Sequence, residues 1–207
     1  MKEMSNFQGR FDCRRYEDRE VLREMERNDP VGEAIARRLA FQKALVEGLP
    51  LNYEEVEKFH AMNTVADAYY DLVFDTMLKG DAYTANVRMG VFGNDVTPTA
   101  ALVITTFRST LGEATGFTVD SGNSTNRSTT TFAASSSQSI TNSASPSRFT
   151  FTGTDIIYGA FITQGATLKD GTQDTAPAVY VAGAKFSASQ NVANGSIIDA
   201  VYTHSKA

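Results

Sequence analysis

Residues 146–164 read PSRFTFTGTDIIYGAFITQ, and this stretch decides the fold. Phe149 and Phe151 alternate with polar residues, a pattern typical of a strand with one buried and one exposed face. After turn residues at 153–155, the run 156–162 is almost continuously apolar, as in a central strand that is covered on both faces. The stretch predicts two strands joined by a tight turn, which would form the core hairpin of an all-β domain.

Gly159 lies inside the apolar run and has no side chain to pack. A glycine within a strand is typical of a bulge, or of a position where a neighbouring part of the protein comes close to the backbone. The sequence therefore predicts one of these two features at Gly159, and it leaves both alternatives open.

The composition excludes several classes of protein. The 207 residues carry a formal net charge of −5, whereas a general nucleic-acid binder needs a cationic surface to neutralise phosphates. Cys13 is the one cysteine, which excludes an internal disulfide framework and a cysteine zinc site. The N-terminus lacks the apolar region of a signal peptide, and no apolar run approaches the roughly 20 residues of a membrane span. We expect a protein that is made in the cytoplasm and binds neither nucleic acid nor a membrane.

The two parts of the chain differ in composition. Residues 1–80 hold 28 of the 43 charged side chains, whereas residues 81–207 are rich in Ser, Thr, Gly and Ala. The change at residues 79–81 indicates a domain boundary. The expected fold class is α+β: an N-terminal arm of three helices for oligomerisation and docking over 1–80, then an antiparallel, jelly-roll-like β-sandwich over 81–207.

The first two expected helices of the arm cover 11–27 and 30–48. The first is mostly charged and has a thin apolar stripe that includes Phe11, Leu22 and Met25. Such a helix is weak alone and needs a partner surface. The second begins at a proline, which is favoured at a first helical position, and is ended by a glycine.

The third expected helix runs from a capping box, formed by Asn52 and Glu55, to about residue 78. Its broad apolar stripe includes Phe59, Tyr69, Tyr70 and Phe74. At about 26 residues it would be roughly 39 Å long. A helix of this length with so wide an apolar face is expected to pack on the β domain, on sister subunits, or on both.

The other strands of the sandwich are short and separated by turn residues. They are expected over 86–92, 101–107, 116–120, 127–133, 139–141, 179–186 and 197–202. Two segments stay ambiguous. Residues 100–111 also fit a short helix, and residues 121–147 are close to low complexity, so a flexible linker is the alternative there to a polar, solvent-facing sheet.

No pattern predicts an enzyme, a cofactor or a metal site. His60 is expected to be a structural residue of the third helix, and His204 is expected to be exposed near the C-terminus. Asp67, Asp71 and Asp75 repeat every four residues, which indicates a solvated helix face, with a divalent-ion stripe as the alternative. Neither a phosphate-binding loop nor a nucleophile elbow of the GxSxG type occurs.

Three motifs occur in order: NSASPSRFTF at 142–151, IYGAF at 157–161 and AKFS at 184–187. Together they resemble a family of small tailed-bacteriophage virion proteins in which NSASPxxFTF, YGAFL and AAxFS recur in this order. The stretch EGLPLNYEEVEKFHAMNTVADAYYDLVFDTMLKG at 47–80 is similar to members of the same group. One departure is isoleucine at position 162, where the family has leucine. The motifs are structural and not chemical in character.

The resemblance implies a non-enzymatic component of a bacteriophage particle with no catalytic residue. The first hypothesis is a capsid decoration or cement protein that binds the lattice of the major capsid protein or other virion proteins, as a dimer or trimer. The alternative is a tail, collar or head–tail connector component with the same sandwich. A glycan-binding module is the third candidate, and the absence of tryptophan counts against it.

The expected structural and interface residues are large apolar side chains of the arm and of the core strands, together with the strand glycine. They are Phe11, Leu22, Met25, Phe59, Tyr69, Tyr70, Phe74, Phe149, Phe151, Tyr158, Gly159, Phe161 and Phe186.

Overall fold

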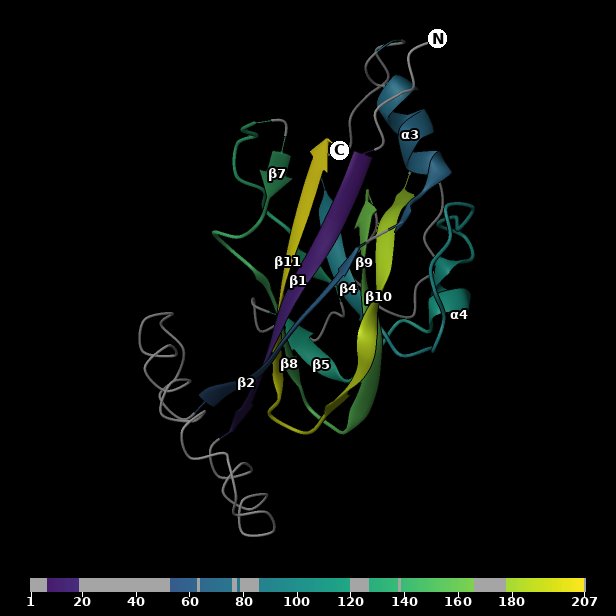
Figure 1. Ribbon diagram of the computed structural model, residues 1–207. Coiled ribbons are helices and arrows are strands. Elements are labelled where there is room, and N and C mark those ends of the chain that lie inside the picture. The colour runs from purple at the N-terminus through teal and green to yellow at the C-terminus, as the bar shows by residue number, and fades with distance from the viewer. Residues whose placement is uncertain are drawn as a thin grey trace.

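Two antiparallel sheets that face each other make up most of the described chain, so the predicted antiparallel β-sandwich is confirmed (Figure 1). The computed structural model describes residues 7–18, 53–62, 64–75, 78, 86–119, 127–137, 139–165 and 178–206.

The first sheet has the strand order β2-β1-β11-β8-β5. The short strand β7 pairs with the C-terminal part of β11, beyond the first residue of β8. The strands of this sheet are β1 (Phe7–Asp18), β2 (Tyr53–Met62), β5 (Phe117–Val119), β7 (Ser139–Thr141), β8 (Ser147–Phe151) and β11 (Ile197–Lys206). Strands from both ends of the chain therefore share this sheet, since β1 pairs with β11 from Phe7 to Tyr16.

The second sheet has the strand order β3-β10-β9-β4-β6. Its strands are β3 (Thr64–Val65), β4 (Val87–Phe92), β6 (Ser128–Thr129), β9 (Asp155–Gln164) and β10 (Val179–Val192). Two short helices accompany it, α3 (Asp67–Phe74) and α4 (Phe107–Leu111). Because β3 follows β2 after one residue, the chain there passes from the first sheet to the second.

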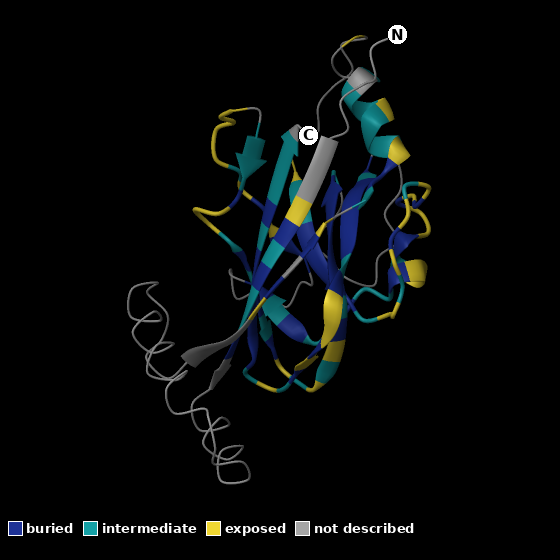
Figure 2. Ribbon diagram, viewed as in Figure 1, coloured by how far each residue is buried: buried dark blue, intermediate teal, exposed yellow. Residues whose placement is uncertain are grey.

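Alternating side chains from the two sheets fill the space between them (Figure 2). Phe11 and Phe149 come from the first sheet, and Ala160 and Ile162 come from the second; each of them is at most 1% exposed. The residues that alternate with them point away from this core: they are polar in the first sheet, such as Arg148 and Thr150, whereas Phe161 of the second sheet enters another apolar cluster.

A second apolar cluster covers the other face of the second sheet. The Phe107 ring of α4 lies 5.1 Å from the Phe161 ring and 5.7 Å from the Tyr180 ring, between centroids. Strand β9 is therefore covered on both faces, as its apolar run predicts. Of the two alternatives for residues 100–111, the helix is present only from Phe107, and turns precede it.

The predicted core hairpin is wrong. Strand β8 pairs with β11 and β5, whereas β9 pairs with β10 and β4. The turn between them carries the chain from one sheet to the other. Both strands still contribute their apolar faces to one core, because the two sheets pack face to face.

Gly159 is a position of close approach. A Cβ at this position would overlap the Phe92 ring and the Ala184 carbonyl oxygen, so this alternative is confirmed. Gly159 itself stays in register with Lys185 of β10 and Phe92 of β4. The register shift comes next to it, between Lys185 and Gln190, and its extra residues belong to β10 and not to the strand of the glycine.

The first predicted helix of the arm is wrong over the described residues, because Phe7–Asp18 form β1. Phe11 and Cys13 are buried and alternate with Arg10, Asp12 and Arg14. The period is thus two and not 3.6, and pairing with β2 and β11 on both sides outweighs the helix preference of the charged residues. The rest of this segment, which contains Leu22 and Met25, lies outside the described residues.

The third predicted helix is also wrong over most of its length. Tyr53–Met62 form β2 and Thr64–Val65 form β3, and of the described residues in this segment Asp67–Phe74 form the helix α3. The helix begins at Asp67, just after the pairing of β3 with β10 ends at Val65. The second predicted helix (30–48) and the predicted domain boundary (79–81) lie outside the described residues. A three-helix arm is therefore not part of this fold.

Candidate functional site

A groove of about 870 Å³ runs over the outer face of the first sheet, and we call it the charged groove. Its floor is formed by β1, β2 and β11, and the loop between β7 and β8 forms one wall. Its charged lining residues are Arg10, Asp12, Arg14, Lys58, Arg148 and Asp199. The volume lies within the range of known ligand pockets, roughly 300–1,000 Å³.

Asn142 holds the wall of the charged groove in place. Its backbone N–H donates to the Tyr202 carbonyl oxygen at 3.3 Å, and its side-chain Oδ1 accepts the Tyr202 N–H at 2.6 Å. Its Nδ2 donates to the Ala200 and Ser145 carbonyl oxygens, each at 3.4 Å. The buried Asn142 thus replaces the ladder bonds that β11 lacks between the end of β7 and the start of β8, and the intervening loop forms the wall of the groove.

A row of four charged residues crosses the groove floor from strand to strand, and we call it the cationic row. Lys58 of β2 lies opposite Arg14 of β1, Arg14 lies opposite Asp199 of β11, and Asp199 lies opposite Arg148 of β8. Three cations therefore share the row with one carboxylate. Like charges placed directly opposite each other in a sheet, as Lys58 and Arg14 are, disfavour the pairing.

Two ion pairs fix guanidinium groups in the groove. Arg148 donates from Nε and Nη2 to the two carboxylate oxygens of Asp199, each at 2.7 Å, which is the bidentate geometry that arginine makes with carboxylates. Arg10 binds the Asp12 Oδ1 at 2.8 Å from Nε and 2.6 Å from Nη2. The Arg148 side chain remains 36% exposed and that of Arg10 52%. The groove thus presents oriented guanidinium groups to solvent.

The thiol of Cys13 lies beneath this floor and is 1% exposed. Its burial raises the pKa of the thiol far above the ordinary value, and the charges of Asp12 and Asp199 add to the effect. A thiol that keeps its proton is a poor nucleophile. Cys13 therefore supplies packing to the sheet and no reactivity to the groove.

We expect Cys13 to react with a disulfide reagent at pH 8 roughly a hundredfold more slowly in the folded protein than in urea. The unfolded thiol ionises near its ordinary pKa of about 8.5, whereas the folded thiol stays protonated. The contribution of this thiol to the stability of the fold is therefore complete below about pH 8.5 and falls as the pH rises above it. Thiol titration measures the rate. In a matched control, Cys13→Ala with Ser189→Cys on the exposed part of β10, the thiol should react readily. Equal rates for the folded and unfolded protein would contradict the burial of Cys13.

His204 does not supply a general base to the groove. His204 of β11 was expected to be exposed, but it is partly buried, with its Nδ1 3.2 Å from the Tyr202 hydroxyl oxygen and its ring edge-on to Tyr69. Burial lowers the pKa of its imidazole. Among the described residues no cluster of His, Cys, Asp and Glu could hold a metal ion. None of the described helices is both long and apolar enough to cross a membrane.

Five of the predicted structural and interface residues lie in the core between the sheets: Phe11, Phe59, Phe149, Phe151 and Phe186. The Phe59 ring of β2 meets the Phe186 ring of β10 edge-on, with centroids 4.5 Å apart. This contact joins the two sheets at the edge where β2 continues into β3. These phenylalanines support the sheet beneath the charged groove and do not line an exposed apolar surface.

The other described predicted residues lie on the second sheet and on α3. Phe161 belongs to the cluster under α4, and Tyr158 packs against that cluster from the same strand. Tyr69 and Tyr70 pack against the main core from α3, which ends at Phe74. These residues therefore stabilise the packing of the second sheet and of α3.

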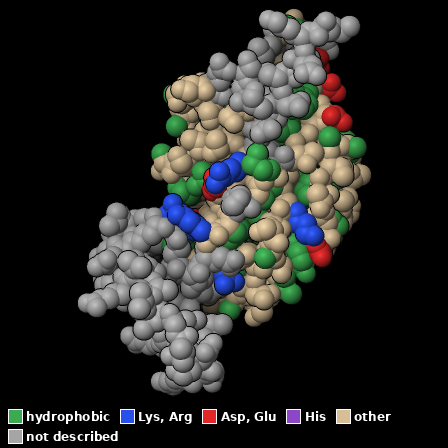
Figure 3. All heavy atoms as spheres, in the orientation of Figure 1, with side chains coloured by type: hydrophobic (Ala, Val, Ile, Leu, Met, Phe, Trp, Pro, Cys, Tyr) green, Lys and Arg blue, Asp and Glu red, His purple; other side chains and the backbone are tan. Residues whose placement is uncertain are grey.

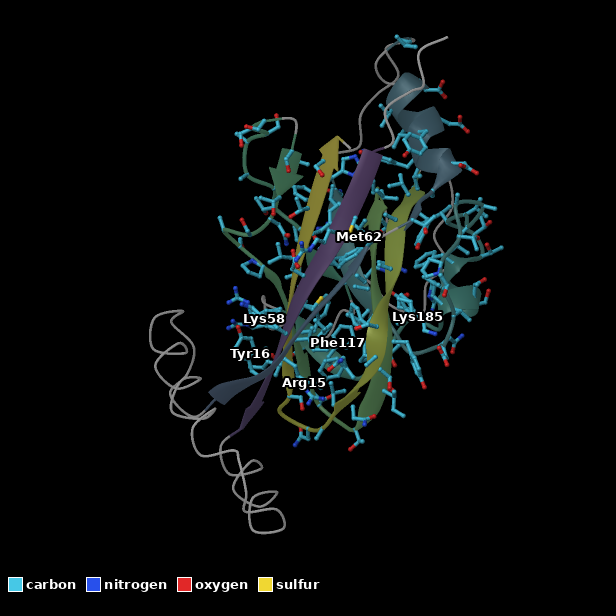
Figure 4. The ribbon with its side chains drawn as sticks, in the orientation of Figure 1. Arg15, Tyr16, Lys58, Met62, Phe117 and Lys185 are labelled. Atoms are coloured by element: carbon cyan, nitrogen blue, oxygen red, sulfur yellow. The ribbon has the colours of Figure 1, made fainter. Side chains whose placement is uncertain are left out.

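Sequence reasoning missed the residues of the charged groove. Arg14 and Lys58 lay in segments predicted as helices, Arg148 was taken as a residue on the polar face of its strand, and Asp199 lay in the strand predicted over 197–202. The detectable signal was the alternation of Phe11 and Cys13 with charged residues, which places the charges on one face of a strand. In Figure 4, Lys58 lies on the outer side of β1, near Tyr16, which also lines the groove.

Comparison with known protein-family models, with curated proteins and with solved structures finds no match to this chain.

Proposed function

We propose that the chain is a non-enzymatic structural protein of a tailed-bacteriophage particle, a capsid decoration or cement protein that binds the lattice of the major capsid protein. In this proposal it is made in the host cytoplasm, is located in the virion, and forms a homo-oligomer. Its jelly-roll-like sandwich is the rigid body that the lattice holds, and the charged groove is a surface for protein contacts.

The observation that carries this proposal is the position in the fold of the motif residues, through which the sequence resembles phage virion proteins. Asn142 binds the backbone of β11 between its pairings with β7 and β8, and Phe149 and Phe151 fill the core. Gly159 admits the Phe92 ring against β9. Every one of these residues maintains the framework, and none contributes a reactive group, which favours a role in assembly over one in catalysis.

The described surface gives little support to glycan binding. Glycan-binding modules present exposed aromatic rings, whereas the large hydrophobic side chains that are exposed among the described residues are Met62, Leu78, Val103 and Ile156. Tyr16 and Phe59 are the aromatic residues that line the charged groove, and both are buried, so neither offers an exposed ring for a sugar to stack on. A structural role therefore remains the better proposal.

Quantitative mass spectrometry of purified particles of the phage that encodes this sequence tests the proposal. A decoration protein should be present in hundreds of copies, in proportion to the capsid subunits. About a dozen copies or fewer would instead assign the chain to a connector, collar or tail, whose symmetry sets that number. Absence from the particle would overturn the virion role altogether.

A further inference from the structure

Helix α3 presents a row of carboxylates to solvent, which we call the acidic edge. Asp67 and Asp71 are exposed and Asp75, the residue that follows α3, is partly exposed and keeps helical backbone angles. The tyrosines at positions 69 and 70 anchor the other side of the helix on the core. Figure 3 shows acidic side chains along α3, at a distance from the Lys and Arg side chains that lie over the first sheet.

The acidic edge and the cationic row have matching lengths. Asp67 and Asp75 are eight residues apart, which corresponds to about 12 Å along a helix, with Asp71 midway. Lys58 and Arg148 are separated by three strand intervals, which corresponds to roughly 14 Å across the sheet. Three carboxylates at intervals of about 6 Å can face the three cations, since the long Lys and Arg side chains can adjust to the unequal cation spacings of one and two strand intervals, about 5 and 10 Å.

We propose that the acidic edge of one copy binds in the charged groove of a second copy of this chain. The inference rests on the proposed function, because it supplies the contact for the homo-oligomer within it. Each copy carries one edge and one groove at separate places, so the contact is head-to-tail. A head-to-tail contact closes into a ring when its rotation allows, and a ring suits a symmetric particle.

The chemistry of the groove favours carboxylates over the phosphates of a nucleic acid. Asp12 and Asp199 lie among its cations, and a continuous phosphate backbone would pass close to both. The net charge of −5 adds a general repulsion for a polyanion. Separate carboxylates on a helix can meet Lys58, Arg14 and Arg148 individually and leave Asp199 in its bidentate pair.

Charge reversal on the purified, full-length protein tests this contact by sedimentation over a concentration series. The wild type should self-associate, and more weakly at high salt, because salt screens exposed charges. Asp71→Lys and Arg14→Glu should each raise the dissociation constant at least about tenfold, because Asp71 and Arg14 are the middle carboxylate and the middle cation of their rows and each change places like charges against one another. The double variant should regain much of the affinity, since its two exchanged side chains are again opposite in sign.

The pair Lys185–Asp95 provides matched controls on another part of the surface. Asp95→Lys and Lys185→Glu make the same charge changes and should leave self-association unchanged. A wild type that is monomeric at every concentration would overturn the proposal, as would single variants that associate like the wild type. Binding of a DNA oligomer that Arg14→Glu abolishes, by a monomeric wild type, would assign the groove to phosphate instead. None of these results depends on whether the chain is found in a particle.

Discussion

Replacing Glu113 by glutamine is expected to lower the free energy of unfolding by roughly 3–5 kcal/mol, the cost of leaving a buried charge without its partner. The Glu113 carboxylate is 1% exposed and accepts hydrogen bonds from Arg127 Nε at 2.6 Å and Nη2 at 2.9 Å. Arg108, the second residue of α4, adds a bond of 2.9 Å from its Nε. The Arg127 side chain is fully buried, with its guanidinium carbon 5.2 Å from the centre of the Phe107 ring. Glutamine keeps the shape of Glu113 but leaves the Arg127 charge uncompensated in the interior.

Urea unfolding measures this loss of stability, and two further variants serve as comparisons. Asp95→Asn removes one partner of the exposed pair with Lys185 and should cost less than about 1 kcal/mol. The double change Glu113→Leu with Arg127→Met removes both buried charges, and it should recover part of the stability that Glu113→Gln loses. A cost below about 1 kcal/mol for Glu113→Gln would show that the ion pair contributes little to the fold.

The β-sandwich could be predicted because its strands from the C-terminal part of the chain carry their own local signal. The alternation at Phe149 and Phe151 and the apolar run of β9 each specify a strand without reference to the rest of the chain. A local pattern does not, however, specify which sheet the next strand joins. The turn after Phe151 is compatible with a hairpin and with a crossover, and only the pairing of β8 with β11 decides between them.

The strands β1 and β2 could not be predicted from composition, because their residues individually favour helices. Arg, Glu and Met have high helix propensity, whereas the strand state of β1 depends on β11 at the far end of the chain. The same dependence hides the charged groove. The cationic row draws one residue from each of four strands: Lys58, Arg14, Asp199 and Arg148. Their spacing in the sequence does not predict that they lie side by side.

The second large effect is expected at Gly159, where alanine should lower the free energy of unfolding by roughly 3 kcal/mol and valine by more. The added Cβ would overlap two groups, the Phe92 ring and the Ala184 carbonyl oxygen. The ring is fully buried and cannot turn away without disturbing the cluster under α4. The carbonyl oxygen belongs to β10, so relief on that side requires the pairing of β9 with β10 to open.

Gly153 provides the matched control for this change, because a Cβ there would have no neighbour within 4 Å. Gly153→Ala should leave the unfolding midpoint nearly unchanged, whereas Gly159→Ala lowers it strongly. The combination of Gly159→Ala with Phe92→Ala separates the two overlaps. If the backbone oxygen of Ala184 is the limiting contact, removal of the ring restores little stability, because a strand cannot move away from its neighbour as a side chain can. Equal midpoints for Gly159→Ala and Gly153→Ala would contradict the close packing of β9 against β10.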